Sequence, residues 1–477
     1  DNQAIIVVGD VDVDHIEAQI KTLFADIKVP ADAAKVIPEQ VSPNDTAIYV
    51  VDKDKEQQFD LFLINMKHKA IPDEMKVNMD YLLMKYMDNA LTLMLNTRFS
   101  EKAQEPDCPY LQAVGDNGDY LMSRTCGAFT LTGLAKEGQV KEAYAAVLRE
   151  AKRAHDFGFT ATEYQRARDE IKSQIEKSLA NKDKMKNEQF TTQYVDHFIA
   201  NEPIPSIEDE SAILQQLIPN IPVEVINMYA KKLICNSDTN FVTLMMMQEK
   251  DGKAYPTEQQ LADIVKGVRA EKLEAYVDHV KNEPLIAQLP KAGKIRKTVE
   301  NKVLGYKELT LSNGAKVIMK KTDFKDNEIL FSAKAKVGYS AFEKADQSSV
   351  MLMTQALDAS GLGNFTNAEL EKAMAGKQAS VKFTMDPFYH GLSGKSTPKD
   401  IETLMQLIYL DMTAVKKDEK SFANLQNTYA TILANQSNNP NLVFQDSVQS
   451  TVYLGSKLAR IPSADDIKAI NYDRLLA

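Results

Sequence analysis

A strand–turn–helix unit occurs twice in this chain, and that repeat constrains the fold more than any other feature. The first copy is the apolar run Ala4–Val8, a polar turn, and helical spacing of apolar residues over 15–24. The second copy is the run Phe241–Met247, a polar turn, and helical spacing over 261–268. A whole domain's worth of chain precedes the second copy, and nothing precedes the first. We therefore expect repeated domains, with residues 1–36 as the terminal strand and helix of an otherwise absent first domain.

The remainder of the chain divides into two further domains joined by a linker. With 477 residues, the chain is too long for a single core. A second domain is expected over 44–282, after a Pro- and Ala-rich stretch. Residues 283–302 are rich in Pro and Lys without a hydrophobic period, which predicts a linker. A third domain follows over 303–477. The motif Pro205-Ser206 recurs as Pro462-Ser463 close to the last residue, which predicts that this domain is incomplete at its C-terminus.

Strands precede helices in the predicted third domain. Strands are predicted at 46–51, 59–66, 111–115, 126–133, 241–247, 307–311, 316–320 and 329–337. Helices are predicted at 73–95, 139–156, 160–186, 188–199, 223–233, 258–282, 348–357, 367–375, 398–412, 419–435 and 442–454. Thr160 and Glu163 have the spacing of a capping box, and Asn313-Gly314 is a strong hairpin turn. The order indicates an α+β fold, with repeated domains of mostly antiparallel sheet packed with helices, rather than a doubly wound parallel sheet.

Charge and composition exclude several classes of function. Lys and Arg number 57 against 67 Asp and Glu, a net charge of −10, which argues against a nucleic-acid surface. No apolar run approaches the roughly 18 residues needed to span a bilayer, so no membrane span is expected. Cys108, Cys126 and Cys235 are few and widely spaced. They form neither a disulfide framework nor a zinc knuckle, and we interpret them as small buried apolar residues.

Three segments, taken in order, carry a family resemblance. They are Val7-Val8-Gly9-Asp10-Val11-Asp12 ahead of a helix, the helix start Gly158–Ala167, and the hairpin opening Leu311–Val317. This arrangement resembles the pitrilysin/insulinase family of zinc metallopeptidases, in its long single-chain bacterial form. The resemblance implies LuxS/metallohydrolase-like domains, four in all, whose two halves close around a peptide. This chain would hold the tail of domain one, all of domain two and most of domain three.

The motif on which that family's chemistry rests is absent from this sequence. In H-x-x-E-H, two imidazoles one helical turn apart bind Zn²⁺ and the Glu activates a water. None of the six histidines here has a second histidine four residues on. The closest metal pair is His279 and Glu283 on the predicted helix, for which a solvated surface pair is the alternative. His390, near Asp386, is interpreted as a turn residue. We expect no catalytic residue and no metal ligand in this chain, and the resemblance assigns zinc to the parent protein.

The third domain contains a position that corresponds to the family motif. Setting Asn364-Phe365 against the residues that follow the motif puts Leu352, Gln355 and Ala356 where His, Glu and His would stand. Leu and Ala have no donor atom for zinc, so this position is degenerate. The run Met245–Met247 is interpreted as a core strand rather than a soft-metal site.

Arg98 and Tyr110 are candidate substrate-binding residues on the basis of the resemblance alone. The family holds substrate near zinc with an Arg and a Tyr after a long helix of its fourth domain. The matching place in the second domain here has Arg98, with Tyr110 at a different spacing. Arg98 would line the substrate cleft or form an interdomain salt bridge. The alternative is a structural cation near a helix end.

The resemblance implies a zinc-dependent endopeptidase acting on peptides or proteins. This chain would be its non-catalytic chamber-wall and substrate-handling portion, inactive alone, with the first and fourth domains as its partners. A catalytically silent scaffold or peptide-binding homologue is the alternative, and an H-x-x-E-H motif upstream would favour the enzyme. An unrelated α+β binding protein is the third hypothesis. The cell envelope or periplasm is the location that the resemblance suggests. Residues 1–24 would pack on domain two or fill an open sheet edge of domain three.

Overall fold

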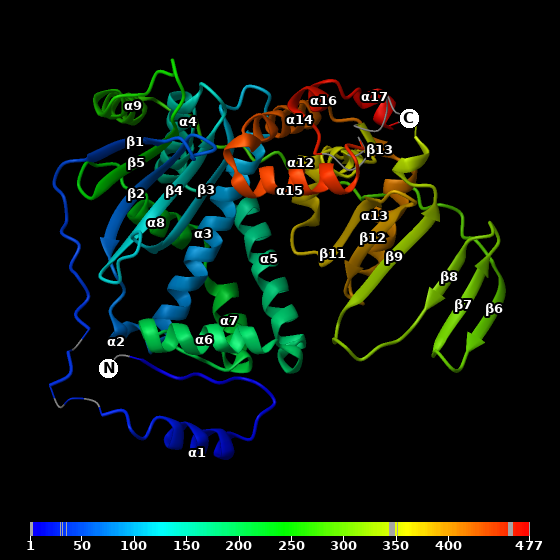
Figure 1. Ribbon diagram of the computed structural model, residues 1–477, viewed down its shortest axis with the longest axis horizontal. Coiled ribbons are helices and arrows are strands. Elements are labelled where there is room, and N and C mark those ends of the chain that lie inside the picture. Colours follow the sequence, from blue (N-terminus) through cyan, green and yellow to red (C-terminus); the bar gives the residue numbers. More distant parts are fainter. Residues whose placement is uncertain are drawn as a thin grey trace.

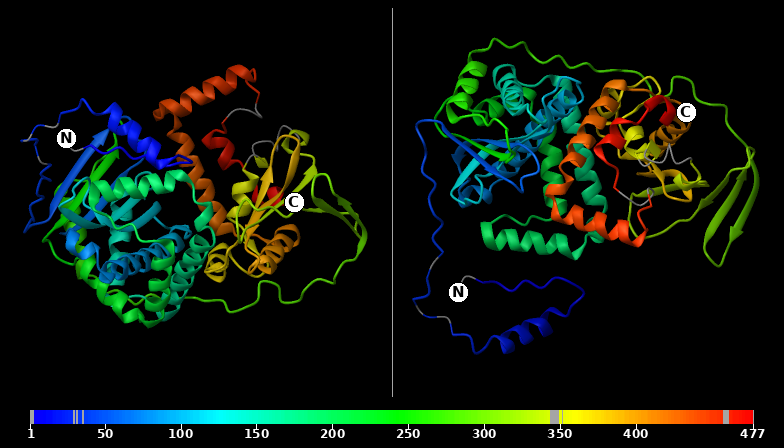
Figure 2. Two further views of the ribbon diagram at one scale, coloured as in Figure 1. Left: turned by 90° about the horizontal axis from the view of Figure 1, so that it is seen from below. Right: turned by 45° about the horizontal axis from the view of Figure 1, so that its top comes forward.

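The computed structural model describes residues 3–28, 30, 32–34, 36–342, 349–350, 352–456 and 461–476. It contains two α+β units of unequal size, and the chain between them includes a long extended segment and a three-stranded meander (Figure 2). We call residues 44–270 the larger unit and residues 329–476 the smaller unit. The predicted fold class, α+β with mostly antiparallel sheets, is confirmed.

A five-stranded sheet with the order β1-β5-β2-β4-β3 forms the centre of the larger unit. Its strands are β1 (Ile48–Asp54), β2 (Leu61–Lys69), β3 (Tyr110–Asp119), β4 (Cys126–Ala135) and β5 (Phe241–Gln248). The pair of β1 with β5 is parallel, and the other pairs are antiparallel. Phe62, Phe129 and Tyr144 are fully buried, and the Tyr144 hydroxyl lies 2.7 Å from Thr243 Oγ1. The sheet and its helices therefore share one continuous core.

Helices cover this sheet and extend below it (Figure 1). They are α2 (Asp73–Lys76), α3 (Met79–Ala103), α4 (Val140–Phe157), α5 (Ala161–Ala180), α6 (Asn187–Ala200), α7 (Ile207–Leu217), α8 (Val223–Leu233) and α9 (Glu258–Ala270). The capping box at the start of α5 is confirmed, because Thr160 and Glu163 each cap the other's backbone N–H. The long helix α3 carries Arg98 on its buried face.

The smaller unit has a three-stranded antiparallel sheet with the order β11-β12-β9. Its elements are β9 (Ile329–Lys336), α11 (Met353–Asp358), β10 (Gly361–Leu362), α12 (Asn367–Met374), β11 (Ala379–Met385), β12 (Tyr389–Ser396), α13 (Ile401–Thr413), β13 (Val415–Lys416), α14 (Glu419–Ala434), α15 (Pro440–Val452), α16 (Ala464–Lys468) and α17 (Tyr472–Leu476). Several small clusters of buried residues replace a single core here. One of them contains Leu352, Ala356, Phe422 and Ile467.

A separate meander of three strands precedes the smaller unit and stands to one side of it (Figure 2). Its strands are β6 (Ile295–Asn301), β7 (Tyr306–Leu311) and β8 (Lys316–Met319). The Asn313-Gly314 turn joins β7 to β8, with Gly314 at φ +89°, a backbone angle that glycine adopts without strain. The prediction of a linker over 283–302 is wrong beyond residue 294, because β6 pairs with β7 there.

Two predictions about the chain before residue 44 have different outcomes. The predicted helix is present as α1 (Val13–Leu23), with every residue at least partly exposed. The predicted strand at Ala4–Val8 is wrong: within the described part of the chain these residues join none of the four sheets, and they do not fill an edge of the smaller unit. A strand needs a neighbour that satisfies its backbone N–H and C=O groups, and apolar composition alone supplies none.

The predicted helix over 258–282 ends early. Its regular part is α9, and the chain continues from Glu271 in an extended conformation. His279 and Glu283 therefore do not lie one turn apart on a helix, and that predicted pairing is wrong. We call residues 271–286 the strap. Among the described helices, none is long and apolar enough to cross a membrane.

Candidate functional site at the junction of the two units

The strap crosses α3, α4 and α5 and is fixed to them by charged side chains. At its beginning, the Glu271 carboxylate accepts hydrogen bonds from Arg149 Nε at 2.6 Å and Nη2 at 2.8 Å. Arg153 Nη1 donates to the carbonyl of Glu274. Further along, the side chains of Tyr276 and Asp278 enter the layer between the helices. These contacts hold the strap extended at the place where the two units meet.

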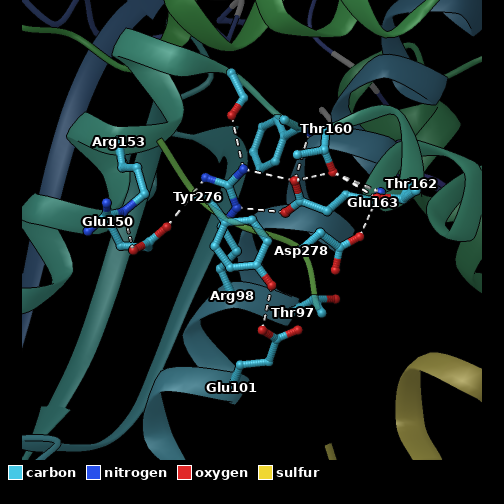
Figure 3. Close-up of polar contacts among 12 residues, drawn as sticks. Thr97, Arg98, Glu101, Glu150, Arg153, Thr160, Thr162, Glu163, Tyr276 and Asp278 are labelled. Carbon is cyan, nitrogen blue, oxygen red and sulfur yellow. Dashed lines mark hydrogen bonds and ion pairs between the residues drawn. The ribbon is translucent and has the colours of Figure 1, made fainter. Parts of the chain in front are cut away.

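Arg98 forms the centre of the polar network beneath the strap (Figure 3). Its Nε and Nη2 donate to the two carboxylate oxygens of Glu163 at 2.6 Å and 2.9 Å, a two-point ion pair. Nη2 also donates to the Gly158 carbonyl at 2.9 Å, and Nη1 lies 3.4 Å from Glu150 Oε1. Arg98 is only 2% exposed, so its charge is neutralised within the protein and not by solvent.

Two aromatic rings enclose the Arg98 guanidinium. Its central carbon lies 4.5 Å from the ring centroid of Phe159 and 4.3 Å from that of Tyr276, both within the range of cation–π attraction. Burial alone would lower the pKa of Arg98. The hydrogen bonds and charge of Glu163, followed by the charge of Glu150, outweigh burial and raise the pKa above its usual value.

Asp278 and Lys372 carry this network from the larger unit into the smaller one. Asp278 forms a two-point ion pair with Arg166 of α5, at 2.8 Å and 3.0 Å, and accepts a hydrogen bond from Thr162. Lys372 of α12 places its Nζ 3.1 Å from Asp278 and 2.9 Å from Glu101 of α3. Burial tends to raise the pKa of Asp278, but Arg166, Thr162 and Lys372 together hold it below its usual value. Lys372 therefore contacts both the strap and the larger unit.

A hollow of about 350 Å³ lies beside this network, between α3, α5 and α12. Glu101, Arg166 and Lys372 line it. The Tyr276 hydroxyl donates to Glu101 at 2.5 Å, and burial raises the pKa of Tyr276, so the phenol stays protonated. Each charged group named here is paired with another. The arrangement is that of an interface between two units, and it does not have the features of a centre for proton transfer or nucleophilic attack.

The two residues predicted to bind substrate lie in the interior. Arg98 has the contacts described above. They are the contacts of a structural cation, the alternative considered from the sequence, that forms a salt bridge beneath the strap. Tyr110 is fully buried, its hydroxyl donates to the Phe99 carbonyl at 3.1 Å, and burial raises its pKa. In this arrangement both side chains direct their polar atoms to partners within the larger unit. A role in substrate contact stays a prediction without support from this geometry.

Two of the three residues at the degenerate motif position belong to an apolar core. Leu352 precedes α11, and Ala356 is fully buried on that helix. Both contact the apolar cluster that contains Phe422 and Ile467. Gln355 Oε1 is buried and receives no hydrogen bond from the described residues. No group of three His, Cys, Asp or Glu side chains in the described part of the chain is arranged to hold a metal ion.

The methionines, cysteines and histidine singled out in the sequence lie in strands or in the core, or are partly exposed. Met245 and Met247 are buried in β5, as expected of a core strand. Cys108 and Cys126 are buried and free, and Cys235 is partly exposed. His390 lies in strand β12 with Nδ1 2.6 Å from the Val337 carbonyl, so its interpretation as a turn residue is wrong.

The sequence pointed to Glu163 only as a helix cap, and it did not point to Tyr276, Asp278 or Lys372. The capping-box spacing identified Glu163, whose carboxylate also binds Arg98. No local pattern marks the other three, because their partners are far away in the sequence. Asp278 and Arg166 are 112 residues apart, and Lys372 and Asp278 are 94 apart.

Known proteins resemble this chain in both sequence and fold. Residues 1–171 match the family described as "Peptidase M16 inactive domain". The chain is 23% identical over 488 residues to the "Zinc protease PQQL-like" of Arabidopsis thaliana, covering 99% of this chain and 44% of that protein. It is 22% identical over 484 residues to the "Probable zinc protease PqqL" of Escherichia coli (strain K12), covering 98% of this chain and 50% of that protein.

One solved structure shares the fold across almost the whole chain. It is that of a mutant of the ferredoxin protease FusC in complex with Arabidopsis ferredoxin, with a TM-score of 0.59 and 16% sequence identity. The match covers 98% of this chain and 51% of that chain. The chain thus spans about half the length of the curated relatives it matches.

Proposed function

Because this chain is a member of the pitrilysin/insulinase family of zinc proteases, we propose that it forms the non-catalytic chamber-wall and substrate-handling portion of a zinc-dependent endopeptidase. In this proposal the parent protein supplies zinc and the water-activating glutamate from a first domain outside these residues. A fourth domain completes the second half of the chamber. The substrates would be peptides or unfolded proteins.

The position of Leu352, Gln355 and Ala356 is the observation that carries the proposal. In a catalytic domain of this family, the corresponding helix presents two imidazoles and a carboxylate to zinc. Here Leu352 and Ala356 contribute to a buried apolar cluster, and neither side chain has an atom that can bind a metal. A helix used in this way serves packing, so we assign the smaller unit a structural role.

The junction supports the chamber-wall part of the proposal. Two units that enclose a peptide must keep a defined relative position, and an interface held by directional ion pairs provides it. Lys372 of the smaller unit makes such pairs with Glu101 and Asp278. Because these pairs are charged and hydrogen-bonded, small changes at the junction would change the relative position of the units.

The proposal is tested by peptide hydrolysis with the purified 477-residue chain. Fluorogenic peptides and unfolded casein are incubated with it, with added Zn²⁺ and with or without the chelator 1,10-phenanthroline. We expect no turnover above a protein-free control in either condition. Zinc-dependent turnover that the chelator abolishes would overturn the proposal. Sequencing upstream then separates enzyme from silent scaffold, since an H-x-x-E-H motif within about two hundred residues favours the enzyme.

A further inference from the structure

Two adjoining hollows lie along α5. The larger, of about 840 Å³, is lined by α3, α5, α6 and α7 together with Lys325 and Glu328. The other, of about 200 Å³, lies between α5 and the smaller unit around β11. Gln174, Lys177 and Asn181 line both hollows, so they form one groove. Figure 1 shows α5 standing between the two sets of elements. We call this the α5 groove.

The α5 groove is basic, although the chain as a whole is acidic. The net charge of the chain is −10. The side chains that line the groove include seven lysines and three glutamates, and no aspartate. Five of these lysines are exposed and form no ion pair with the described residues: Lys177, Lys184, Lys186, Lys377 and Lys395. Unpaired charge of one sign in a concave surface attracts ligands of the other sign.

The acidic residues in the lining reduce this excess only in part. Glu170 is engaged locally, because its carboxylate accepts hydrogen bonds from the Gly376 N–H and from Gln174. Glu328 lies 3.6 Å from Lys325, so these two charges balance one another. The third, Glu210, stands at the α7 side of the groove. The five unpaired lysines remain in excess.

The uncharged lining suits a polypeptide better than a nucleic acid. It is rich in amide side chains, which can donate to and accept from a peptide backbone. Asn181 lies where the hollows join, and its buried Oδ1 receives no hydrogen bond from the described residues, so a backbone N–H would satisfy it. Single-stranded nucleic acids are held by several stacked aromatic rings. The described lining has one aromatic residue, Tyr86, whose hydroxyl already bonds to that of Tyr164 at 2.8 Å.

We propose that the α5 groove binds acidic segments of polypeptide in an extended conformation. The lysines contact Asp and Glu side chains, and the amide side chains contact the backbone. The inference rests on the proposed function, because it gives the substrate-handling surface a chemical preference. Its test uses binding and not hydrolysis. A chain that binds such peptides but also cleaves them would overturn the proposed function alone, and an inactive chain that fails to bind them would overturn this inference alone.

The experiment measures fluorescence anisotropy of labelled peptides with the full chain. The probe peptide alternates Glu with Ser, and its partner has Gln in place of every Glu. We expect the Glu peptide to bind at least about tenfold more tightly than the Gln peptide, and its binding to weaken as salt is added. The variant K177E/K377E is expected to weaken Glu-peptide binding by about tenfold or more.

A charge-matched control separates the groove from general electrostatics. The variant K231E/K266E changes the net charge by the same amount at exposed lysines of α8 and α9, outside both hollows. It should change the affinity by less than about twofold. If K177E/K377E does not fold, as judged by circular dichroism, K177Q/K377Q replaces it. The proposal would be overturned by any of four results. These are an equal loss of Glu-peptide affinity in both variants, equal binding of the two peptides, no binding at all, or tighter binding of an oligodeoxythymidylate.

Discussion

Lys372 and Asp278 lie opposite each other where the two units meet, with Lys372 Nζ 3.1 Å from Asp278 Oδ1. Their side chains are 9% and 3% exposed, so water contributes little to solvating either charge. Each charge depends on the other and on the remaining partners, Glu101 and Arg166. The relative position of the units is therefore linked to the charge state of a few side chains.

Replacing Lys372 with Met should loosen the strap. The change leaves Glu101 without its cation, while Asp278 keeps Arg166, so we expect a loss of about 1–3 kcal/mol of stability. Hydrogen exchange of strap amides should become at least about tenfold faster. Lys399→Met is the control, because Lys399 is 71% exposed beside Glu176. Unchanged exchange in Lys372→Met, or the same increase in the control, would contradict this account of the junction.

Replacing Glu163 with Gln should destabilise the larger unit strongly. Arg98 would keep its charge in a buried site, and the more distant Glu150, at 3.4 Å, would be its one remaining carboxylate among the contacts described above. Leaving one buried charge uncompensated costs about 3–5 kcal/mol, which urea unfolding would measure. The double variant Arg98→Met/Glu163→Met should lose less than the sum of the two single variants, because it leaves no uncompensated charge. Additive losses would show that the two residues act independently.

Replacing Asp411 with Asn should stabilise the chain at neutral pH. Burial, and then the charge of Asp358, raises the pKa of Asp411 to about 6. The folded value lies above the unfolded one, so the folded state favours the protonated acid. Ionising Asp411 in the folded protein therefore costs stability. This cost is absent below about pH 4 and is complete once the pH has risen past about 6.

Asp411→Asn is expected to raise the free energy of unfolding by on the order of 1 kcal/mol at neutral pH. The value is kept small because the side chain is only partly buried. No increase is expected near about pH 3.5. Urea unfolding at the two pH values measures it. Asp251→Asn, in an exposed turn, is the control that removes one carboxylate outside this buried site. A gain that is equal at both pH values would rule out titration as its cause.

Two glycine-to-alanine substitutions should change the stability of the chain in opposite directions. Gly158 ends α4 with φ +71°, and a Cβ there would lie 2.4 Å from Asn227 Cγ. Gly158→Ala is therefore expected to cost at least about 2 kcal/mol. Gly267 lies inside α9 with open space around it, so Gly267→Ala should stabilise by about 0.5–1 kcal/mol. Thermal unfolding of both variants checks the pair, and destabilisation by Gly267→Ala would contradict it.

Elements specified by local pattern could be predicted from the sequence. The α5 capping box, the Asn313-Gly314 turn and helix α8 (Val223–Leu233) all depend on residues within a few positions of one another. Strands β11 and β12 were not predicted. Their alternating positions carry small or polar side chains, and their pairing with each other and with β9 decides their conformation.

The strap shows why the candidate site could not be predicted in full. Residues 271–282 have a charged composition that is compatible with a helix. Their side chains instead form ion pairs and hydrogen bonds with α3, α4 and α5, more than 100 residues earlier. Interactions of this kind override local helix propensity, and no spacing within the segment encodes them. The same holds for Lys372, which a sequence pattern would treat as a solvated lysine.

The parallel pairing of β1 with β5 has a consequence for the order in which the larger unit is assembled. Asn44 and Asn240, beside the ends of these strands, form a hydrogen bond although 196 residues separate them. During synthesis β2, β3 and β4 can pair among themselves early, whereas β1 must wait until β5 has emerged. Contacts of such long sequence separation slow folding. We therefore expect a late folding step in which β5 pairs with both β1 and β2, and so joins β1 to the sheet that β2, β3 and β4 have already formed.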